Sequence, residues 1–529
     1  MSIACGSRHS CDQSPNAAHT VETPCAKRDR AWVLAASVLG SSLAFIESSI
    51  VNLALPDLQL DLDLGSIELQ WIVNSYLLML GSLLMIGGAS GDRIGLRRVY
   101  LLGLALFGGA SFGCAVAPGY GWLLTWRILQ GTGAALLVPT SLAIINVHFD
   151  EESRGRAIGI WAGASALTTA LGPVIGGALV DVAGWRAVFA IIVPLSAAAL
   201  LVALWRLPHS EGRAQGAVDW LGAGLLAASL WLFTYVLINA GGSVESYLMI
   251  GLSVVGMGAF LVREATARAP LVPLGLFRSL PFSGANAMTM ALYFALAGAL
   301  YFIPFNLIQV QGYSALAAGA AFLPMTLMLG FGSALAGEQL KRYPARNLLT
   351  VGSLLAGSGF ALLAIPGTES DFVNDWLPGI LAMGFGMTLC VAPLTTVVMG
   401  SVDAERSGIA SGINNTAARF AGALAIALLS ALAIQLFSNE LSTRLADLAV
   451  SESIQQEMLA GSHRLAELAP PADAIEVAAL REAVTSSYVS TFRRLMMICA
   501  GFAALAAVLA WFTLGAVENA RGGQAEDKS

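Results

Sequence analysis

The sequence predicts an all-α integral membrane protein. Of its 529 residues, 56% are hydrophobic and only 12% are charged, whereas about 25% of the residues in a soluble globular domain are charged. The hydrophobic residues lie in long blocks, and several blocks reach the length of about 20 residues that a helix needs to cross the hydrocarbon core. Because the bilayer core has no water to satisfy open backbone groups, these blocks are expected to be helices.

The hydrophobic blocks predict about 14 membrane spans. Short segments with glycine, polar or charged residues separate neighbouring blocks, as expected of loops at the two membrane surfaces. The expected spans are 32–55, 70–90, 99–118, 122–146, 157–181, 187–206, 220–240, 246–264, 283–306, 315–336, 348–366, 377–399, 408–436 and 493–517.

Positively charged residues predict the orientation of these spans. Arginine and lysine gather before the first span and in every second loop after it, whereas most loops on the other side have few; the loop 56–69 carries acidic residues instead. Short loops rich in arginine and lysine stay on the cytoplasmic side. Both termini are therefore expected to be cytoplasmic, in a protein that crosses the cell (inner) membrane many times.

The segment 437–491 is an exception, because it is long, polar and expected on the external side. Long loops follow the charge rule poorly. Leu441, Leu445 and Leu448 recur at helical spacing, and Pro470-Pro471 is expected to divide the segment into two helical pieces. Two interpretations stay open: a cover over the external face, and a docking surface for a periplasmic adaptor protein.

An internal repeat predicts two halves. GDRIGLRR (91–98) joins spans 2 and 3, and GEQLKRYPAR (337–346) joins spans 10 and 11. Two six-helix bundles with two inserted helices give this offset, and such repeats are typical of secondary transporters with a binding site between the halves. The expected regions are a cytoplasmic tail 1–30, an N-terminal six-helix bundle 31–206, two inserted helices with their loops 207–280, a C-terminal six-helix bundle 281–517 that contains 437–491, and a cytoplasmic tail 518–529.

Few charges lie inside the expected spans, and each is a candidate functional residue because a charge in the hydrocarbon is costly. These are Glu47 in span 1, Arg127 in span 4 and Arg419 in span 13. Counted from the external span ends, Glu47 and Arg127 lie at depths that differ by roughly 3 Å. They are therefore expected to share a site in which Glu47 binds and releases a proton. A static ion pair is the alternative, and for Arg419 a purely structural role stays open.

Several function classes find no support in the sequence. The only lysines are Lys27, Lys341 and Lys528, and none follows a glycine, so the chain has no G-x-x-x-x-G-K-[ST] phosphate loop for ATP. The net charge of −6 argues against nucleic acid as a partner. The six cysteines fit no zinc spacing, and no metal, cofactor or catalytic cluster is expected. A receptor would need a signalling domain, for which only 437–491 offers room.

Four sequence motifs carry further candidates. They are GASGDRIGLRR between spans 2 and 3, RILQGTGAA in span 4, GPVIGG in span 5 and FIESSIVNLALP in span 1. Their glycines permit a tight turn in the loop and close helix packing in the spans. The candidate residues are Gly88, Asp92, Arg93, Gly95, Arg97 and Arg98 in the loop, Arg127 and Gln130 in span 4, Gly159, Gly172, Pro173, Gly176 and Gly177 in span 5, and Glu47 and Asn52 in span 1.

These motifs together resemble the major facilitator superfamily, specifically its fourteen-helix drug:proton antiporter branch, over about residues 30–436 and the last helix. The resemblance implies the major facilitator fold, a latch on the cytoplasmic gate formed by the loop motif, and proton transfer by Arg127. It also implies export, which the glycine-proline motif of span 5 marks. The sequence departs from the family pattern at Leu96, usually arginine or lysine, at Thr168, usually glycine, and at Glu47, more often aspartate.

The resemblance further implies a cavity with walls from spans 1, 2, 4, 9 and 12. Aromatic faces suit flat apolar ligands, and an acid beside them favours a lipophilic cation. The sequence thus predicts proton-coupled export of drugs or similar amphiphilic small molecules by alternating access, with transport of one metabolite, such as a vitamin or pigment, as the alternative. The candidate substrate-facing residues are Asn52, Asn74, Tyr76, Gln130, Tyr293 and Tyr301.

Overall fold

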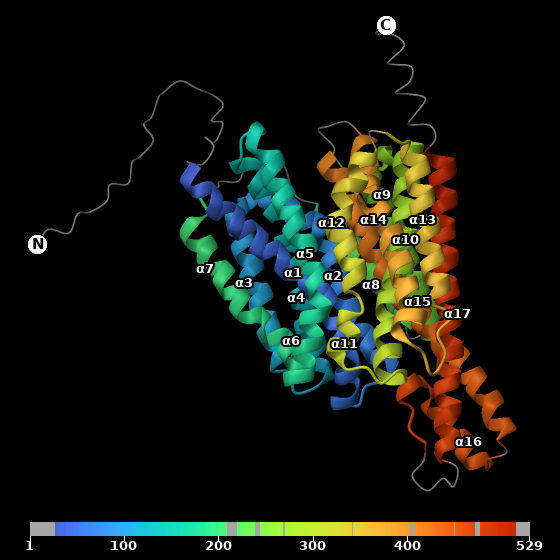
Figure 1. Cartoon of the computed structure of the whole chain (residues 1–529). Helices are drawn as coiled ribbons and strands as arrows, with labels where there is room; N and C mark the ends of the chain where they lie inside the picture. Colours follow the sequence, from blue (N-terminus) through green and yellow to red (C-terminus); the bar gives the residue numbers. More distant parts are fainter. Residues whose placement is uncertain are drawn as a thin grey trace, which may run out of the picture.

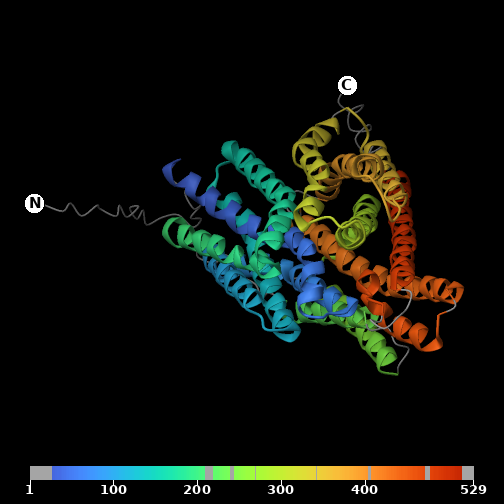
Figure 2. The same cartoon turned by 60° about the horizontal axis from the view of Figure 1, so that its bottom comes forward.

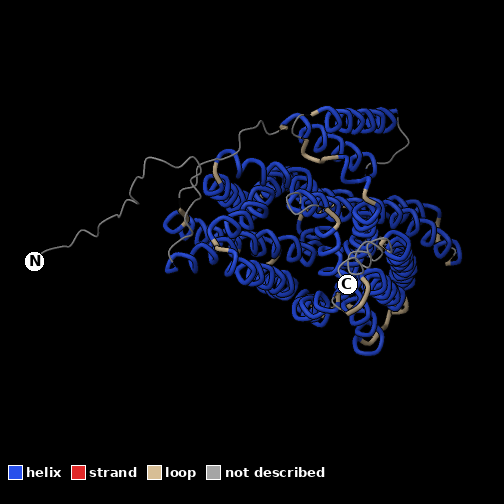
Figure 3. The backbone as a smooth tube through the Cα atoms, turned by 90° about the horizontal axis from the view of Figure 1, so that it is seen from above, coloured by secondary structure: helices blue, strands red, loops and turns tan. Residues whose placement is uncertain are grey.

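The computed structural model describes most of the chain, and within this part every regular element is a helix (Figure 3). The predicted all-α class is therefore confirmed. The two expected tails lie outside the described residues, apart from 27–30. The described residues are 27–208, 219–238, 244–267, 270–340, 342–402, 407–448, 450–470 and 477–514.

The helices follow the hydrophobic blocks of the sequence in order (Figure 1). Among the described residues, 13 helices are long and apolar enough to cross a membrane. The remaining expected span, 348–366, coincides with α13, an 18-residue helix whose first turn holds Arg346 and Asn347. The helices are α1 (Lys27–Asp61), α2 (Ser66–Ile94), α3 (Leu96–Ala115), α4 (Tyr120–His148), α5 (Glu151–Ala183), α6 (Trp185–Ala190), α7 (Ile192–Arg206), α8 (Trp220–Ile238), α9 (Val244–Thr266), η1 (Leu274–Arg278), α10 (Leu280–Phe305), η2 (Asn306–Val310), α11 (Ala315–Ala320), α12 (Leu323–Gln339), α13 (Ala345–Leu362), η3 (Phe372–Trp376), α14 (Leu377–Gly400), α15 (Ser407–Asp447), α16 (Glu452–Ala460), η5 (Gly461–Glu467) and α17 (Val477–Thr513).

The segment 437–491 is built largely from extensions of two membrane helices. α15 continues past 436 to Asp447, and α17 begins at Val477 rather than at 493. Leu441 and Leu445 are fully buried, so the apolar stripe of α15 continues beyond its membrane-length part and the helix does not end there. The two extensions, α16 and η5 project together at the bottom of Figure 1.

The helices form two bundles with an inserted pair. In the N-terminal bundle, α1 packs against α4, α5 and α7, and α4 packs against α2 and α3. In the C-terminal bundle, α13 packs against α14 and α17, α10 against α15 and α17, and α12 against α14. The inserted helices α8 and α9 pack on each other, and α8 also contacts α2 and α15. The pair therefore lies over a seam between the two bundles (Figure 2).

The two ends of the molecule differ in how the bundles meet. We refer to the end where α1 begins and α17 ends as the termini end, and to the opposite end as the α16 end (top and bottom of Figure 1). At the α16 end, Gln309 donates to Gln59 over 3.2 Å, and Arg464 pairs with Asp63 at 2.9 Å. Toward the termini end the bundles diverge (Figure 1). Several hydrogen bonds between described residues join the two bundles. Of these, the bond from Thr416 to the Gly81 carbonyl lies farthest from the α16 end.

Glycines place α4 directly against its neighbours. A Cβ added at Gly131 would lie 2.6 Å from the carbonyl oxygen of Tyr76 in α2, and one added at Gly133 would lie 2.7 Å from the backbone nitrogen of Phe107 in α3. Small residues permit such close helix approach inside a membrane. As a result Arg127, one turn before Gly131, lies in the middle of the N-terminal bundle.

Candidate functional site

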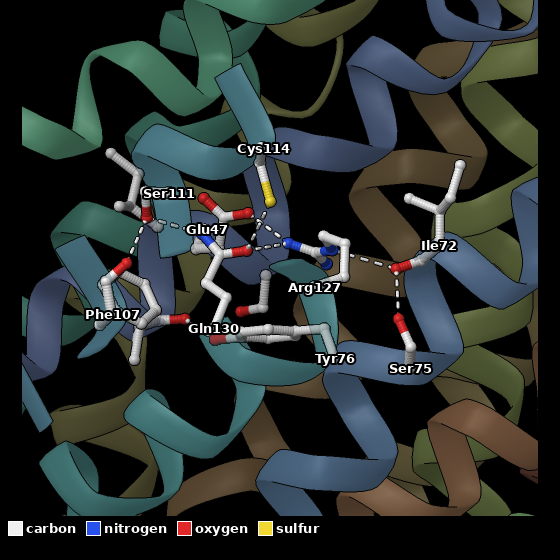
Figure 4. Close-up of polar contacts among 12 residues, drawn as sticks. Glu47, Ile72, Ser75, Tyr76, Phe107, Ser111, Cys114, Arg127 and Gln130 are labelled. Atoms are coloured by element: carbon white, nitrogen blue, oxygen red, sulfur yellow. Dashed lines mark hydrogen bonds and ion pairs between the residues drawn. The ribbon is translucent and has the colours of Figure 1, made fainter. Parts of the chain in front are cut away.

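Glu47 and Arg127 form a buried ion pair between α1 and α4. The Arg127 Nη1 and Glu47 Oε1 atoms are 2.5 Å apart, and the exposed fractions of the two side chains are 1% and 0%. Figure 4 shows both side chains pointing toward each other inside the N-terminal bundle. The pair expected from helix depths is therefore present, and its role in proton coupling stays a prediction.

Arg127 is held from three further sides. Its Nε donates to the Ile72 carbonyl over 3.0 Å, and its Nη1 donates to Gln130 Oε1 over 2.7 Å. The guanidinium carbon lies 4.5 Å from the centroid of the Tyr76 ring. A charge-assisted hydrogen bond and a cation–π contact both stabilise the charged guanidinium in a dry interior. Arg127 is therefore fixed in place whether or not Glu47 carries a charge.

A hydrogen-bond chain leads from this pair into α3. Gln130 Nε2 donates to Ser111 Oγ over 2.9 Å, and Ser111 Oγ donates to the Phe107 carbonyl over 2.7 Å (Figure 4). The chain fixes the orientation of the Gln130 amide, so that its oxygen faces Arg127. Gln130 thus serves the ion pair and is completely buried.

The second carboxylate oxygen of Glu47 has no partner. Glu47 Oε2 is buried and makes no hydrogen bond with any described residue. An unsatisfied charged oxygen in a dry interior is costly, and desolvation favours the neutral form of a carboxyl group. Oε2 is accordingly the atom at which a proton would relieve this cost, while Oε1 remains beside Arg127.

The structure divides the predicted substrate-facing residues into separate groups. Tyr76 is fully buried and donates to the Ala44 carbonyl over 3.0 Å, so it belongs with Gln130 to the surroundings of Arg127. Asn74 is also fully buried, and neither of its amide atoms has a partner among the described residues. Asn52 and Tyr293 are partly exposed.

Tyr301 lies at the α16 end, away from the ion pair. Together with Ser430 and Tyr488 it lines a small cavity between the bundles, to which Gln59 and Arg464 also contribute. The Ser430 and Tyr488 hydroxyls are buried without a partner among the described residues. This cavity is therefore part of the closure at the α16 end.

The loop motif lies at the termini end. Gly95 joins α2 to α3 with φ 107°, a left-handed conformation that favours glycine. The Arg97 guanidinium donates to the Leu204 carbonyl of α7 over 2.7 Å, and Arg93 and Arg98 are exposed. Gly88 faces Pro139 of α4, 3.7 Å from a Cβ built on it. The Asp92 side chain lies outside the described residues.

The glycine-proline motif of α5 faces two different neighbours. Gly172 and Gly176 lie against Ser49 and Ile50 of α1. Gly177 lies against the Ala315 backbone at the start of α11, in the other bundle. Pro173 lies inside α5, and its carbonyl contacts the Gly319 position of α11. The motif thus joins α5 both to its own bundle and to the opposite one. The surroundings of Gly159 lie outside the described side chains.

A family model described as the Major Facilitator Superfamily matches residues 37–426. The chain belongs to the major facilitator superfamily. This assignment and the 13 candidate spans confirm the predicted family and fold class. This member of the superfamily is a multi-pass membrane transporter that acts on small molecules, and it is not an enzyme.

Relatives of this major facilitator protein include resistance and export proteins. The chain is 31% identical over 525 residues to the "Tetracenomycin C resistance and export protein" of Streptomyces glaucescens, and the match covers 96% of this chain and 96% of the relative. It is 33% identical over 438 residues to the "Multidrug resistance protein Stp" of Mycobacterium tuberculosis H37Rv, or 82% of this chain and 81% of the relative.

Among solved structures, a bacterial homologue of the human lysosomal transporter Spinster, in an inward-facing and occupied conformation, has a similar fold. The TM-score is 0.64 at 19% sequence identity, and the match covers 92% of this chain and 97% of that one. At this level of identity the likeness supports the fold alone.

Sequence reasoning missed two residues that this major facilitator site uses. Ser111 anchors Gln130, and Asp181 at the end of α5 accepts hydrogen bonds from the backbone N–H groups of Ala315 and Leu316, both over 2.9 Å. The signal for Asp181 was its position as an acid at the end of a span. An acid at that position can cap the N-terminus of another helix. Nothing in the local sequence around Ser111 indicates its partner in α4.

Proposed function

We propose that this transporter is a proton-coupled exporter of drugs or other small amphiphilic molecules that works by alternating access. The observation that carries the proposal is the Glu47–Arg127 pair, a carboxylate sealed in the middle of a membrane bundle with one oxygen unpartnered. The names of its resistance and export relatives support the direction of transport and the kind of cargo. The cost of burying a charge in the membrane supports a functional role for Glu47.

The pair offers a simple means of coupling. A proton on Glu47 removes the negative charge that faces Arg127, and so weakens the charge-assisted contact between α1 and α4. Arg127 keeps its hydrogen bonds to Ile72 and Gln130, so α1 is the helix that is released. Because α1 also packs against α5 and contacts α10 and α11 of the other bundle, a change at Glu47 reaches the surfaces along which the bundles rock.

The charge rule supports the assignment of the termini end to the cytoplasm of the cell (inner) membrane. With this orientation, closure at the α16 end and divergence toward the termini end correspond to a conformation that faces inward. A cargo would then enter from the cytoplasm, and a proton would enter from outside in the opposite conformation. Arg93, Arg97 and Arg98 at the termini end would take part in the cytoplasmic gate, as the family resemblance implies.

The contacts of 437–491 favour the interpretation as a cover. Ser66 in α2 donates to the His463 carbonyl over 2.6 Å, and Arg464 pairs with Asp63. Both contacts hold η5 on the N-terminal bundle, across the seam. Docking of a periplasmic adaptor protein on the same segment stays a prediction.

Replacing Glu47 by glutamine tests the coupling. Inverted membrane vesicles with an acidic lumen are expected to accumulate at least one of three probes, namely rhodamine 6G, carboxyfluorescein or riboflavin, when they contain the native transporter. Glu47→Gln keeps the size and hydrogen-bonding capacity of the side chain but cannot release a proton. We expect accumulation to fall to the level of vesicles without transporter, as measured by dye fluorescence.

Glu482→Gln is the matched control, because Glu482 is an exposed carboxylate near the start of α17 and its substitution should leave accumulation unchanged. Equal gradient-driven accumulation by native protein and Glu47→Gln would remove Glu47 from the mechanism and leave a static ion pair. Accumulation of riboflavin alone would favour the alternative, a transporter of one metabolite.

A further inference from the structure

Arg419 is a second cation inside the membrane, and it points across the seam between the bundles. It lies about 18 Å along α15 from the start of that helix at Ser407. Its Cβ is 3.1 Å from a Cβ built on Gly81 in α2, and its guanidinium carbon is 5.9 Å from the centroid of the Phe45 ring in α1. The side chain therefore extends from the C-terminal bundle toward two helices of the N-terminal bundle, not along α15 toward a membrane surface.

Among the residues that the structure describes, no acidic side chain neutralises Arg419. It makes no ion pair and donates no hydrogen bond to any residue that the structure describes. Glu47 is the only acid in the middle of a described span, and it already forms an ion pair with Arg127 at 2.5 Å. The other acids of the described helices, for example Asp57 and Asp181, lie within about two turns of a helix end. With Glu47 ionised, the described charges at this depth, Glu47, Arg127 and Arg419, leave an excess of one positive charge.

The face that carries Arg419 is polar and accessible. Ser411, Asn415 and Arg419 recur every four residues, so they lie on one side of α15. Asn415 is exposed and Arg419 is partly exposed. Beside this face, Asn414 accepts a hydrogen bond from Thr289 of α10 over 2.7 Å. A polar stripe halfway along a membrane helix, next to the seam between bundles, fits a surface that lines the transport route.

Aromatic side chains lie near the guanidinium. The Phe45 ring is 5.9 Å from its central carbon, and Trp161 of α5 meets Phe45 edge to face at a centroid distance of 6.3 Å. Tyr293 lies one turn after Thr289, the α10 residue that donates to Asn414 beside this face. An unpaired guanidinium among aromatic rings offers one charge-assisted contact and several apolar faces to a ligand.

We propose that Arg419 binds an acidic group of the cargo, so that the transporter carries flat amphiphiles with a carboxylate, phenolate or similar anionic group. The cargo supplies the counter-charge that the described residues lack at this depth. This inference rests on the proposed transport function and names its substrate class. It differs from the lipophilic cation expected from the sequence, because the acid on which that expectation depended is sealed by Arg127.

The test uses two dyes with the same xanthene ring system and opposite charge, carboxyfluorescein and rhodamine 6G. Their binding to the detergent-purified full chain is measured by fluorescence polarisation. Arg419→Gln removes the charge, Arg419→Lys keeps it, and Arg278→Gln removes an exposed arginine at the end of η1. We expect carboxyfluorescein to bind the native protein and to bind Arg419→Gln about 10- to 100-fold more weakly. Arg419→Lys should recover part of this loss, and Arg278→Gln should behave as native.

Rhodamine 6G binding to Arg419→Gln is expected to be equal to or stronger than binding to the native protein, and an unfolding temperature equal to that of the native protein shows that the variant is folded. The inference is wrong if native protein does not bind carboxyfluorescein, or if Arg419→Gln binds it as tightly as native protein. Binding is measured without a pH gradient, so loss of proton coupling would refute the proposed function and leave this result unaffected.

Discussion

Arg127→Met is expected to destabilise the transporter by about 3–5 kcal/mol and to abolish transport. The substitution leaves the Glu47 carboxylate fully buried with no cation beside it, and it removes the donor to the Ile72 carbonyl. A buried charge that loses its partner bears the full cost of its desolvation. Thermal unfolding of the detergent-purified protein and gradient-driven dye accumulation in vesicles measure the two effects.

The exposed ion pair of Arg186 with Asp61 supplies the matched control. Its atoms are 2.7 Å apart, but the exposed fractions of the two side chains are 44% and 48%, so Arg186→Met should cost at most about 1 kcal/mol. The double variant Glu47→Gln with Arg127→Met should regain much of the stability, because no unpaired charge remains, and should still fail to transport. Gradient-driven transport by the double variant would show that the pair serves stability alone.

The sequence was sufficient to predict this pair because the prediction needs only the positions of the two charges along their hydrophobic blocks. A hydrophobic block must cross the bilayer, so the position of a charge within the block gives its depth, and equal depths bring Glu47 and Arg127 into reach. The order and approximate limits of the helices follow from the same argument. The family motifs add the loop at Gly95, where the positive φ explains the glycine.

Features that depend on the rotation and contact of helices were not predictable in this way. The partner of Gln130 is Ser111, and only the packed α3–α4 interface brings them together. The direction of Arg419 depends on how α15 lies against α2. The sequence predicted that α15 ends at 436 and that α17 begins at 493, so both helices were expected to be too short. An apolar stripe that packs on neighbouring helices continues a helix even where the average hydrophobicity of the sequence falls.

Gly177→Val is expected to reduce transport to background while leaving each bundle folded. A Cβ at Gly177 would meet the Ala315 carbonyl, with the Leu316 Cα 2.7 Å away, and backbone atoms cannot turn aside as a side chain can. Asp181, one turn further along α5, holds the N-terminus of α11 at the same place. A valine therefore separates α5 from α11 and prevents closure at the α16 end, a step that each transport cycle requires.

Gly163→Val in the same helix is the control, because no atom of the described part of the chain lies within 4 Å of a Cβ built on Gly163. Closure is measured with a bifunctional thiol cross-linker through cysteines placed at Asp63 and Arg464, in a background without the tail cysteines. The charged atoms of these two residues are 2.9 Å apart, and the spacer of the cross-linker takes the place of the long arginine side chain. We expect cross-linking and dye accumulation to be lost in Gly177→Val and kept in Gly163→Val, with similar unfolding temperatures for both. Normal transport by Gly177→Val would mean that the α5–α11 contact is only a packing surface. A seal formed in every cycle cannot tolerate an isopropyl group against a backbone carbonyl.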